Sequence, residues 1–452
     1  MKTHRLYLLV VTLIVSAFIL VACGGDTTEP AAPVVDEPAV VEEPVEEPVE
    51  EPVEEPEAEP TEVPMEEPEA EPTEEPMEEP AAPEISLTIW ADDTRTPVLL
   101  DLARAFEEEY GVALIVEQIA DIRDQFRIAA PAGEGPDIII IPHDQIGELI
   151  ESGLLAPIDL GVKEEMFREE AVAAFFYDGE QYGMPYATEN LGFFRNTDQV
   201  PDEPATWEEV YEIAVALTDA GDATEGFILS GTTYDAFPIQ TAFGGYIFGR
   251  DAEGNFDPTD VGVDSEGMVE AISFIDRLVE EGLMPQSTDW DTAHVLFENG
   301  ETPFIMAGPW ALPRIRESGV PYAISAFPEG PGGRGVPFLG VQGFVINALS
   351  DNVALAQAFL TEFVATDATM QALYDADPRP SAWIPVFEAT DDPDLAGFSL
   401  AGEGGIPMPA IPEMSAVWGA WDAGVTLVIQ QQLDPEGAMT DAGQQIRDLI
   451  EN

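Results

Sequence analysis

The sequence predicts an α/β fold with a parallel β-sheet, because segments typical of strands alternate with segments typical of helices from residue 85 onward. Residues 137–141, Asp-Ile-Ile-Ile-Ile, form a continuous apolar run of the kind found in parallel strands buried on both faces. The part of the chain from residue 85 to residue 452 exceeds the usual size of one hydrophobic core. We therefore expect two lobes.

Each element of this alternation has its own signal. Residues 85–90 alternate apolar and polar side chains, and residues 97–110 place apolar side chains at helical spacing before Gly111, a helix stop. Residues 112–117 have the pattern of a second strand. Other helices are expected near residues 121–130, 206–219, 264–281, 290–299, 351–365, 413–432 and 435–451. Other strands are expected near residues 303–307, 322–326 and 339–347.

Polar loops follow the first and third predicted strands. Residues 92–95 are Asp-Asp-Thr-Arg, and residues 142–145 are Pro-His-Asp-Gln. Ligands of open α/β sheets bind beyond the carboxyl ends of the strands. Both loops therefore lie where we expect a ligand.

The acidic composition excludes several kinds of partner. The chain has 89 acidic and 16 basic side chains, and residues 85–452 hold 65 acids against 14 bases. Phosphate binding needs clustered Lys and Arg, so we expect no nucleic-acid partner and no docking on an anionic lipid surface. One cysteine and three histidines allow no disulfide, no cysteine-based metal site and little for a histidine-based one. We expect no metal and no cofactor.

The first 23 residues have the pattern of an export signal, because Lys2, His4 and Arg5 precede an apolar run at residues 6–22. The run ends Leu-Val-Ala-Cys-Gly, with the cysteine at position 23, which resembles the lipobox of bacterial lipoproteins. That resemblance implies that Cys23 is lipidated and that the chain is cleaved just before it. An uncleaved transmembrane anchor is the alternative, although the small residues beside Cys23 favour the lipobox.

Residues 24–84 have the composition of a disordered stalk. They contain 24 acids, 14 prolines and no Lys or Arg, and Glu-Glu-Pro-Val or close variants repeat from residue 42. Frequent proline interrupts helices and favours polyproline II, and dense like charge extends the chain. We expect a semi-rigid spacer that holds the folded part away from a membrane. Calcium binding by the acidic repeats is an alternative.

Several segments, taken in order, resemble the maltose/maltodextrin-binding proteins, which are extracellular receptors of carbohydrate ABC importers. They lie at residues 135–144 with 152–156, at 183–189, at 206–209, at 300–301 with 307–310, and at 411–418. The resemblance covers essentially all of residues 85–452. It implies a two-lobe periplasmic-binding-protein-like fold with hinge crossings and a cleft between the lobes. Lobe one would comprise residues 85–187 and 343–390, and lobe two residues 192–338 and 394–452.

The resemblance also implies a binding site for a neutral oligosaccharide such as maltose or maltodextrin. Aromatic rings pack on the C–H faces of a pyranose, while charged side chains take the hydroxyls at its rim. The positions that match ligand contacts of the family are Asp93, Arg95, Asp144, Glu189, Tyr234, Trp310 and Trp418. Phe237 and Trp290 lie near them in that pattern.

Each candidate has a plainer interpretation. Trp418 has Met414 and Trp421 at helical spacing, which is also typical of core packing, and Asp144 and Glu189 could be ordinary surface acids. His143 could contact a ligand, but a loop histidine bonded to the backbone is the favoured interpretation.

The chain departs from the family at three positions. Some members carry a tryptophan where Ile141 stands, an arginine where Gln145 stands and an aromatic residue where Gly419 stands. These differences leave the length and linkage of the sugar open, unless Trp383 or Trp421 compensates.

We expect a monomeric receptor, lipid-anchored at the extracytoplasmic face of the bacterial cell membrane, that delivers sugar to an ABC permease and is not an enzyme. No glycosidase motif surrounds Asp144 or Glu189, and the only thiol lies at Cys23. Two alternatives remain: a receptor for a different neutral sugar, and a tethered surface glycan-binding protein that is not coupled to transport.

Overall fold

The computed structural model describes residues 85–287 and 289–451. The predicted signal peptide at 1–23, with Cys23, and the predicted stalk at 24–84 lie outside the described residues. Among the helices of the described part, none is both long enough and apolar enough to cross a membrane.

A mixed sheet forms the centre of the first lobe. Its strands lie in the order β16-β15-β3-β1-β2, with β4 and β7 also paired to β15. Their bounds are β1 Ser86–Ala91, β2 Ala113–Gln118, β3 Ile138–Pro142, β4 Leu155–Ala156, β7 Gly183–Glu189, β15 Phe338–Asn347 and β16 Ile406–Pro407. The prediction of parallel strands is confirmed for β1, β2 and β3, whereas β15 runs antiparallel to β3. It does so because the chain enters β15 from the other lobe and not through a helical crossover.

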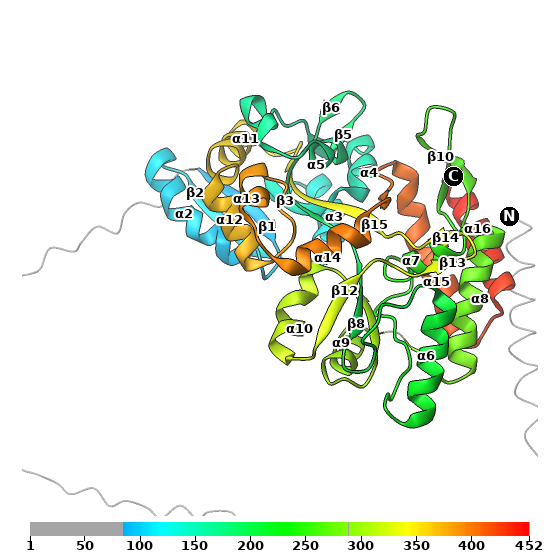
Figure 1. The fold of residues 1–452 in the computed structure, drawn as a ribbon. Helices are drawn as coiled ribbons and strands as arrows, with labels where there is room; N and C mark the ends of the chain where they lie inside the picture. Colours follow the sequence, from blue (N-terminus) through cyan, green and yellow to red (C-terminus); the bar gives the residue numbers. More distant parts are fainter. Residues whose placement is uncertain (1–84, 288, 452) are drawn as a thin grey trace, which may run out of the picture. The chain divides into compact units, whose positions relative to one another are not determined.

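Helices cover this sheet (Figure 1). They include α2 (Thr96–Tyr110), α3 (Ile122–Ala132), α12 (Asp367–Ala376) and α13 (Ile384–Ala389), together with α11 (Val353–Phe359), which continues as a π-helical turn at Leu360–Val364. The end of α2 follows its sequence signal, because Gly111 takes φ 67° and its N–H bonds the carbonyl of Glu107. One cluster of buried apolar residues joins positions 87–187 to positions 341–386.

The second lobe has a smaller, three-stranded antiparallel sheet in the order β11-β8-β12. These strands are β8 (Gly192–Asn196), β11 (Phe304–Ala307) and β12 (Tyr322–Ser325). The long helices of this lobe are α6 (Trp207–Ala220), α8 (Glu266–Glu280), α15 (Val417–Ile429) and α16 (Pro435–Ile450). Helix α6 begins where the sequence indicates, because the Thr206 hydroxyl accepts a 3.1 Å bond from the N–H of Glu209. Two apolar clusters within residues 191–446 form the core.

The remaining elements are short, apart from α9 and α14. The helical ones are η1 His143–Gln145, α4 Ile146–Glu151, η2 Gly161–Met166, α5 Glu169–Ala174, α7 Phe237–Ala242, α9 Trp290–Glu298, η3 Pro309–Ala311, α10 Leu312–Ser318, α14 Pro393–Gly402 and η5 Pro412–Ala416. The strands are β5 Phe176–Tyr177, β6 Glu180–Gln181, β9 Phe248–Arg250, β10 Phe256–Val261, β13 Glu329–Gly330 and β14 Gly333–Arg334.

Two strand segments carry the chain between the lobes. Strand β7 ends at Glu189 and β8 begins at Gly192, while β15 starts at Phe338 in the second core and reaches the first core by Val341. Gly192 is required at the first crossing, because a Cβ atom there would lie 2.6 Å from the side chain of Ile324. We propose that the apolar clusters are the cores of lobe one and lobe two, with the bounds expected from the sequence.

One buried histidine in lobe two lacks hydrogen bonds. His294 on α9 is fully buried, and neither ring nitrogen has a partner among the described residues. Burial, followed by the charge of Arg314, lowers its pKa from 6.5 to about 3. The unfolded chain therefore binds a proton as the pH falls below 6.5 while the folded chain does not, and stability is lost as the pH falls from 6.5 towards 3.

Replacing His294 should reduce this loss. We predict that His294→Phe gains stability over the wild type and that the gain is about 2 kcal/mol larger at pH 5 than at pH 7.5, because phenylalanine takes up no proton. Urea unfolding at both pH values measures the difference, with Val295→Ala at an exposed position of the same helix as the control. An equal gain at both pH values would contradict the prediction.

Candidate functional site

A cavity of about 790 Å³ lies between the two lobes. Lobe one lines it mainly with polar and charged residues: Asp121, Arg123, Asp124, Arg127, Pro142, Asp144, Gln145, Glu189 and Arg379. Lobe two lines it largely with aromatic residues: Thr233, Tyr234, Asp235, Trp290, Trp310, Met408, Ser415 and Trp418. One wall therefore offers ring faces and the other offers hydrogen-bonding groups.

The aromatic wall is held by the core of lobe two. The rings of Tyr234 and Trp310 lie 6.2 Å apart at 46°, and Trp418 stacks on buried Trp421 at 5.7 Å. Trp310 follows β11 in a Gly-Pro turn, where a Cβ on Gly308 would come within 2.2 Å of its indole ring. Glycine at 308 thus allows the indole to fold back over the turn. Trp418 packs on the core with one part of its surface and lines the cavity with another.

Asp144 lines the cavity with a buried carboxylate that lies beside the indole of Trp418. It lies in the turn after β3 and is 2% exposed, and its Oδ1 has no hydrogen-bond partner among the described residues. Burial raises the pKa of its carboxyl group, while the charge of Arg123, 3.5 Å from Oδ2, acts in the opposite direction. The indole N–H of Trp418 approaches this carboxylate and also acts to lower its pKa, without reaching hydrogen-bond geometry.

The neighbouring His143 fixes this turn. Its Nδ1 accepts a 3.1 Å bond from the N–H of Val341, so its Nε2 carries the proton and donates to the carbonyl of Met408 at 3.2 Å. Burial lowers its pKa to about 4, which keeps the ring neutral. The interpretation as a backbone-bonded loop histidine is confirmed.

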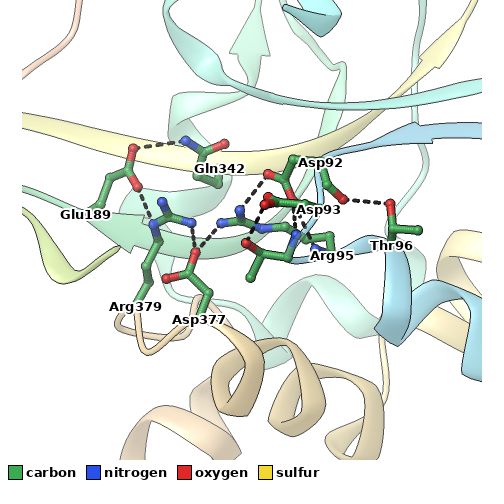
Figure 2. Close-up of polar contacts among 9 residues, drawn as sticks. Asp92, Asp93, Arg95, Thr96, Glu189, Gln342, Asp377 and Arg379 are labelled. Carbon is green, nitrogen blue, oxygen red and sulfur yellow. Dashed lines mark hydrogen bonds and ion pairs between the residues drawn. The ribbon is translucent and has the colours of Figure 1, made fainter. Parts of the chain in front are cut away.

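Glu189 belongs to a chain of buried ion pairs (Figure 2). Its Oε1 accepts a 2.9 Å bond from Gln342, and its Oε2 lies 2.7 Å from Nε of Arg379. Arg379 also pairs with Asp377, which in turn lies 2.5 Å from Arg95. The guanidinium of Arg379 lies 5.4 Å from the ring centre of Trp310, so it contacts both walls of the cavity.

Burial within this chain raises the pKa of both inner carboxyl groups. The pKa of Glu189 rises to about 7, against the hydrogen bond from Gln342 and the charge of Arg95. The pKa of Asp377 rises to about 6, against the charge of Arg95. The charge of Arg95 thus limits, but does not cancel, the rise that burial causes in both pKa values.

Asp93 and Arg95 do not line the cavity. The Asp92 carboxylate accepts bonds from the N–H groups of Thr94 and Arg95, which folds the loop directly into α2. Asp93 consequently lies exposed, and buried Arg95 pairs with Asp92 at 2.6 Å and with Asp377. Their role as ligand contacts stays a prediction.

The positions that depart from the family pattern have different environments. Ile141 is buried in the core of lobe one, whereas Gln145 lines the cavity and accepts a 3.0 Å bond from Arg127. Gly419 is exposed, and a Cβ atom there would meet no heavy atom of the described chain within 4 Å. Trp383 and Trp421 are both buried and are not among the residues that line the cavity, so neither compensates.

Sequence reasoning missed several cavity residues. Arg123, Arg127, Arg379 and Asp235 lie in segments that carry no recognised motif. The rarity of basic residues is the available signal, because three of the 14 bases after residue 84 line this one cavity. No group of three or more His, Cys, Asp and Glu in the described part of the chain is arranged to hold a metal ion.

Comparison with known proteins gives a consistent set of matches. Residues 101–396 match the family described as bacterial extracellular solute-binding protein. The chain is 29% identical over 383 residues to the galactooligosaccharide-binding protein of Bacillus subtilis, covering 80% of this chain and 89% of that protein. It is 27% identical over 365 residues to the maltotriose-binding protein of Pyrococcus abyssi, covering 76% and 78%. It is 25% identical over 380 residues to a maltooligosaccharide ABC transporter solute-binding lipoprotein of Streptococcus pneumoniae, covering 80% and 88%.

The shared carboxylate of the buried chain should be important for stability. We predict that Asp377→Asn destabilises the protein by about 3 kcal/mol, because it leaves Arg95 and Arg379 buried without their common counterion. Denaturant unfolding measures the change. Asp124→Asn is the control, since Asp124 is exposed and pairs with Arg127 at 3.4 Å, and its replacement should cost less than about 1 kcal/mol. Similar small losses in both variants would show that the buried chain is not required.

Proposed function

The chain belongs to the bacterial extracellular solute-binding protein family, and we propose that it binds a maltose- or maltodextrin-type oligosaccharide and delivers it to an ABC import permease. Members of this family are solute-binding proteins and not enzymes. The residue-by-residue assignment of the sugar site to Asp144, Glu189, Tyr234, Trp310 and Trp418 is part of the proposal.

The chemical asymmetry of the cavity is the observation that carries this proposal. A pyranose offers apolar C–H faces and a rim of hydroxyls, which suits a site with aromatic rings on one side and charged acceptors on the other. Trp310, Tyr234 and Trp418 supply the rings, and the Asp144 carboxylate lies at the cavity on the opposite wall. A sugar hydroxyl that donates to this carboxylate would offset part of the cost of burying its charge.

A different neutral sugar is the second candidate. The relative at 29% identity is named for galactooligosaccharides, while the relatives at 27% and 25% are named for maltotriose and maltooligosaccharides. Lobe one also lacks the aromatic and the arginine that some maltodextrin receptors carry, at Ile141 and Gln145. A tethered glycan-binding protein that does not serve a permease would use the same cavity.

We also propose that the protein is a monomer anchored to the outer face of the cell membrane by a lipid on Cys23. The lipobox-like sequence before Cys23 supports the anchor, and the Streptococcus pneumoniae relative is named a lipoprotein. Residues 24–84 would then separate the membrane from the sugar-binding part.

Loss of the central ring should weaken sugar binding. We predict that Trp310→Ala lowers the affinity for maltotriose roughly thirtyfold, about 2 kcal/mol, because it removes a stacking surface from the aromatic wall. Asp144→Ala should also weaken binding, because it removes a carboxylate that accepts a hydrogen bond from a sugar hydroxyl. Titration calorimetry with maltose, maltotriose, cellobiose and trehalose measures both effects.

Phe176→Ala is the control for this experiment, since Phe176 is 55% exposed and does not line the cavity. No heat with maltotriose on the wild type would reject the glucan and leave the receptor assignment in place. Wild-type affinity in Trp310→Ala would reject the placement of the site.

The anchor can be tested separately. We predict that Cys23→Ser blocks lipidation and cleavage but leaves the affinity for sugar unchanged, because the cavity is built from residues beyond position 120. Membrane fractionation, metabolic lipid labelling and calorimetry measure the three properties. Membrane association with an uncleaved precursor in cells that lipidate other lipoproteins would support the transmembrane alternative.

A further inference from the structure

Asp235 is the one charged residue among the described residues that line the cavity from lobe two. It follows Tyr234 directly and precedes α7, so its carboxyl group lies beside the aromatic wall. The other charged lining groups, such as Asp144 and Glu189, come from lobe one or its crossing strand. The family pattern in the sequence did not point to Asp235.

Two neighbours hold the Asp235 carboxylate in place. The hydroxyl of Ser230 donates a 2.9 Å bond to Oδ1 and also lies 3.4 Å from the carbonyl of Met306 at the end of β11. On the other side, a Cβ atom on Gly231 would lie 2.3 Å from Oδ2. The carboxylate therefore occupies space that only a glycine at position 231 leaves free.

The surroundings of this carboxylate make it a strong acceptor. Asp235 is partly exposed to the cavity, and burial of the remainder raises the pKa of its carboxyl group. The hydroxyl of adjacent Tyr234 is buried without a partner among the described residues. A sugar stacked on this wall thus meets the charged acceptor of Asp235 at its rim.

We propose that Asp235 is a specificity-determining residue that accepts hydrogen bonds from hydroxyls of the sugar unit packed on the aromatic wall. This inference rests on the proposed function. Asp144 and Glu189 would approach the same oligosaccharide from the opposite wall, so acceptors on both lobes fix the orientation of its hydroxyls. An epimer that turns one hydroxyl away leaves a partly buried carboxylate unpaired, and such sites discriminate strongly.

The test compares two trisaccharides, maltotriose and β-1,4-galactotriose, which differ in the configuration of the C4 hydroxyl and of the glycosidic linkages, by titration calorimetry on the purified protein. Asp235→Asn should lower the affinity for the better ligand about tenfold or more and the affinity for the poorer ligand less than about threefold. Gly231→Ala should lower the ratio of the two affinities, better ligand to poorer ligand, as Asp235→Asn does. The added methyl group displaces the Asp235 carboxylate, and position 231 does not itself line the cavity. Asp219→Asn, an exposed carboxylate on α6, makes the same charge change and should leave both affinities unchanged.

The outcomes separate this inference from the proposed function. A lower ratio of affinities in Asp235→Asn and Gly231→Ala, with melting temperatures close to that of the wild type, supports it. An unchanged ratio, whether both affinities fall equally or neither falls, overturns it while sugar binding stands. A wild-type protein that binds neither trisaccharide overturns the proposed function, and this inference with it.

Discussion

Two buried arginines determine where the loops of lobe one lie. Removing a charge from water costs several kcal/mol unless a counterion accompanies it, so Arg95 and Arg379 must each contact a carboxylate. Asp377 serves both, and Asp92 and Glu189 complete the chain at its two ends. The loop after β1, the segment after α12 and the end of β7 are thereby joined. Glu189 reaches the cavity in a fixed position as a result.

Much of this architecture could be predicted from the sequence, because apolar spacing and stop signals are local properties. The eight helices and six strands expected beyond residue 84 all occur, and the helix expected at 351–365 contains a π-helical turn. Asp144 and Trp310 follow strands and Glu189 ends one, whereas Tyr234 precedes α7 and Trp418 lies in the first turn of α15, and all five line the cavity. The position of Arg95 could not be predicted in this way. The backbone N–H groups of Thr94 and Arg95 both donate to the Asp92 carboxylate and turn the loop inward, and the spacing of residues along the chain does not indicate such bonds. Arg379 was missed because Glu189 and Trp310, which bring it to the cavity, are distant from it in sequence.

Strand β15 links the sheet to the cavity. It pairs with β3 and β7 in lobe one, and Gly340 at its start lies opposite Glu189. Only a glycine fits there, because a Cβ atom would come within 2.9 Å of the Glu189 side chain. The backbone of Val341 also supports His143, and Gln342 bonds Glu189. Three successive residues of one strand therefore position both acidic groups of the lobe-one wall. Hinge-type closure of the lobes about this strand would leave the positions of Asp144 and Glu189 relative to each other unchanged.

The division of chemistry between the walls has a consequence for how such genes diversify. Apart from Asp235, the charged groups of the cavity are encoded in stretches separate from those that encode its rings. Point mutations or exchange of segments around codons 121–145 would change hydroxyl recognition and leave Tyr234 and Trp310, whose positions depend on the core of lobe two, in place. A duplicated copy could thus keep moderate affinity for pyranoses while its preference drifts. The range of glycans that such receptors bind would then change through substitutions in one wall of the cavity while the other wall stays the same.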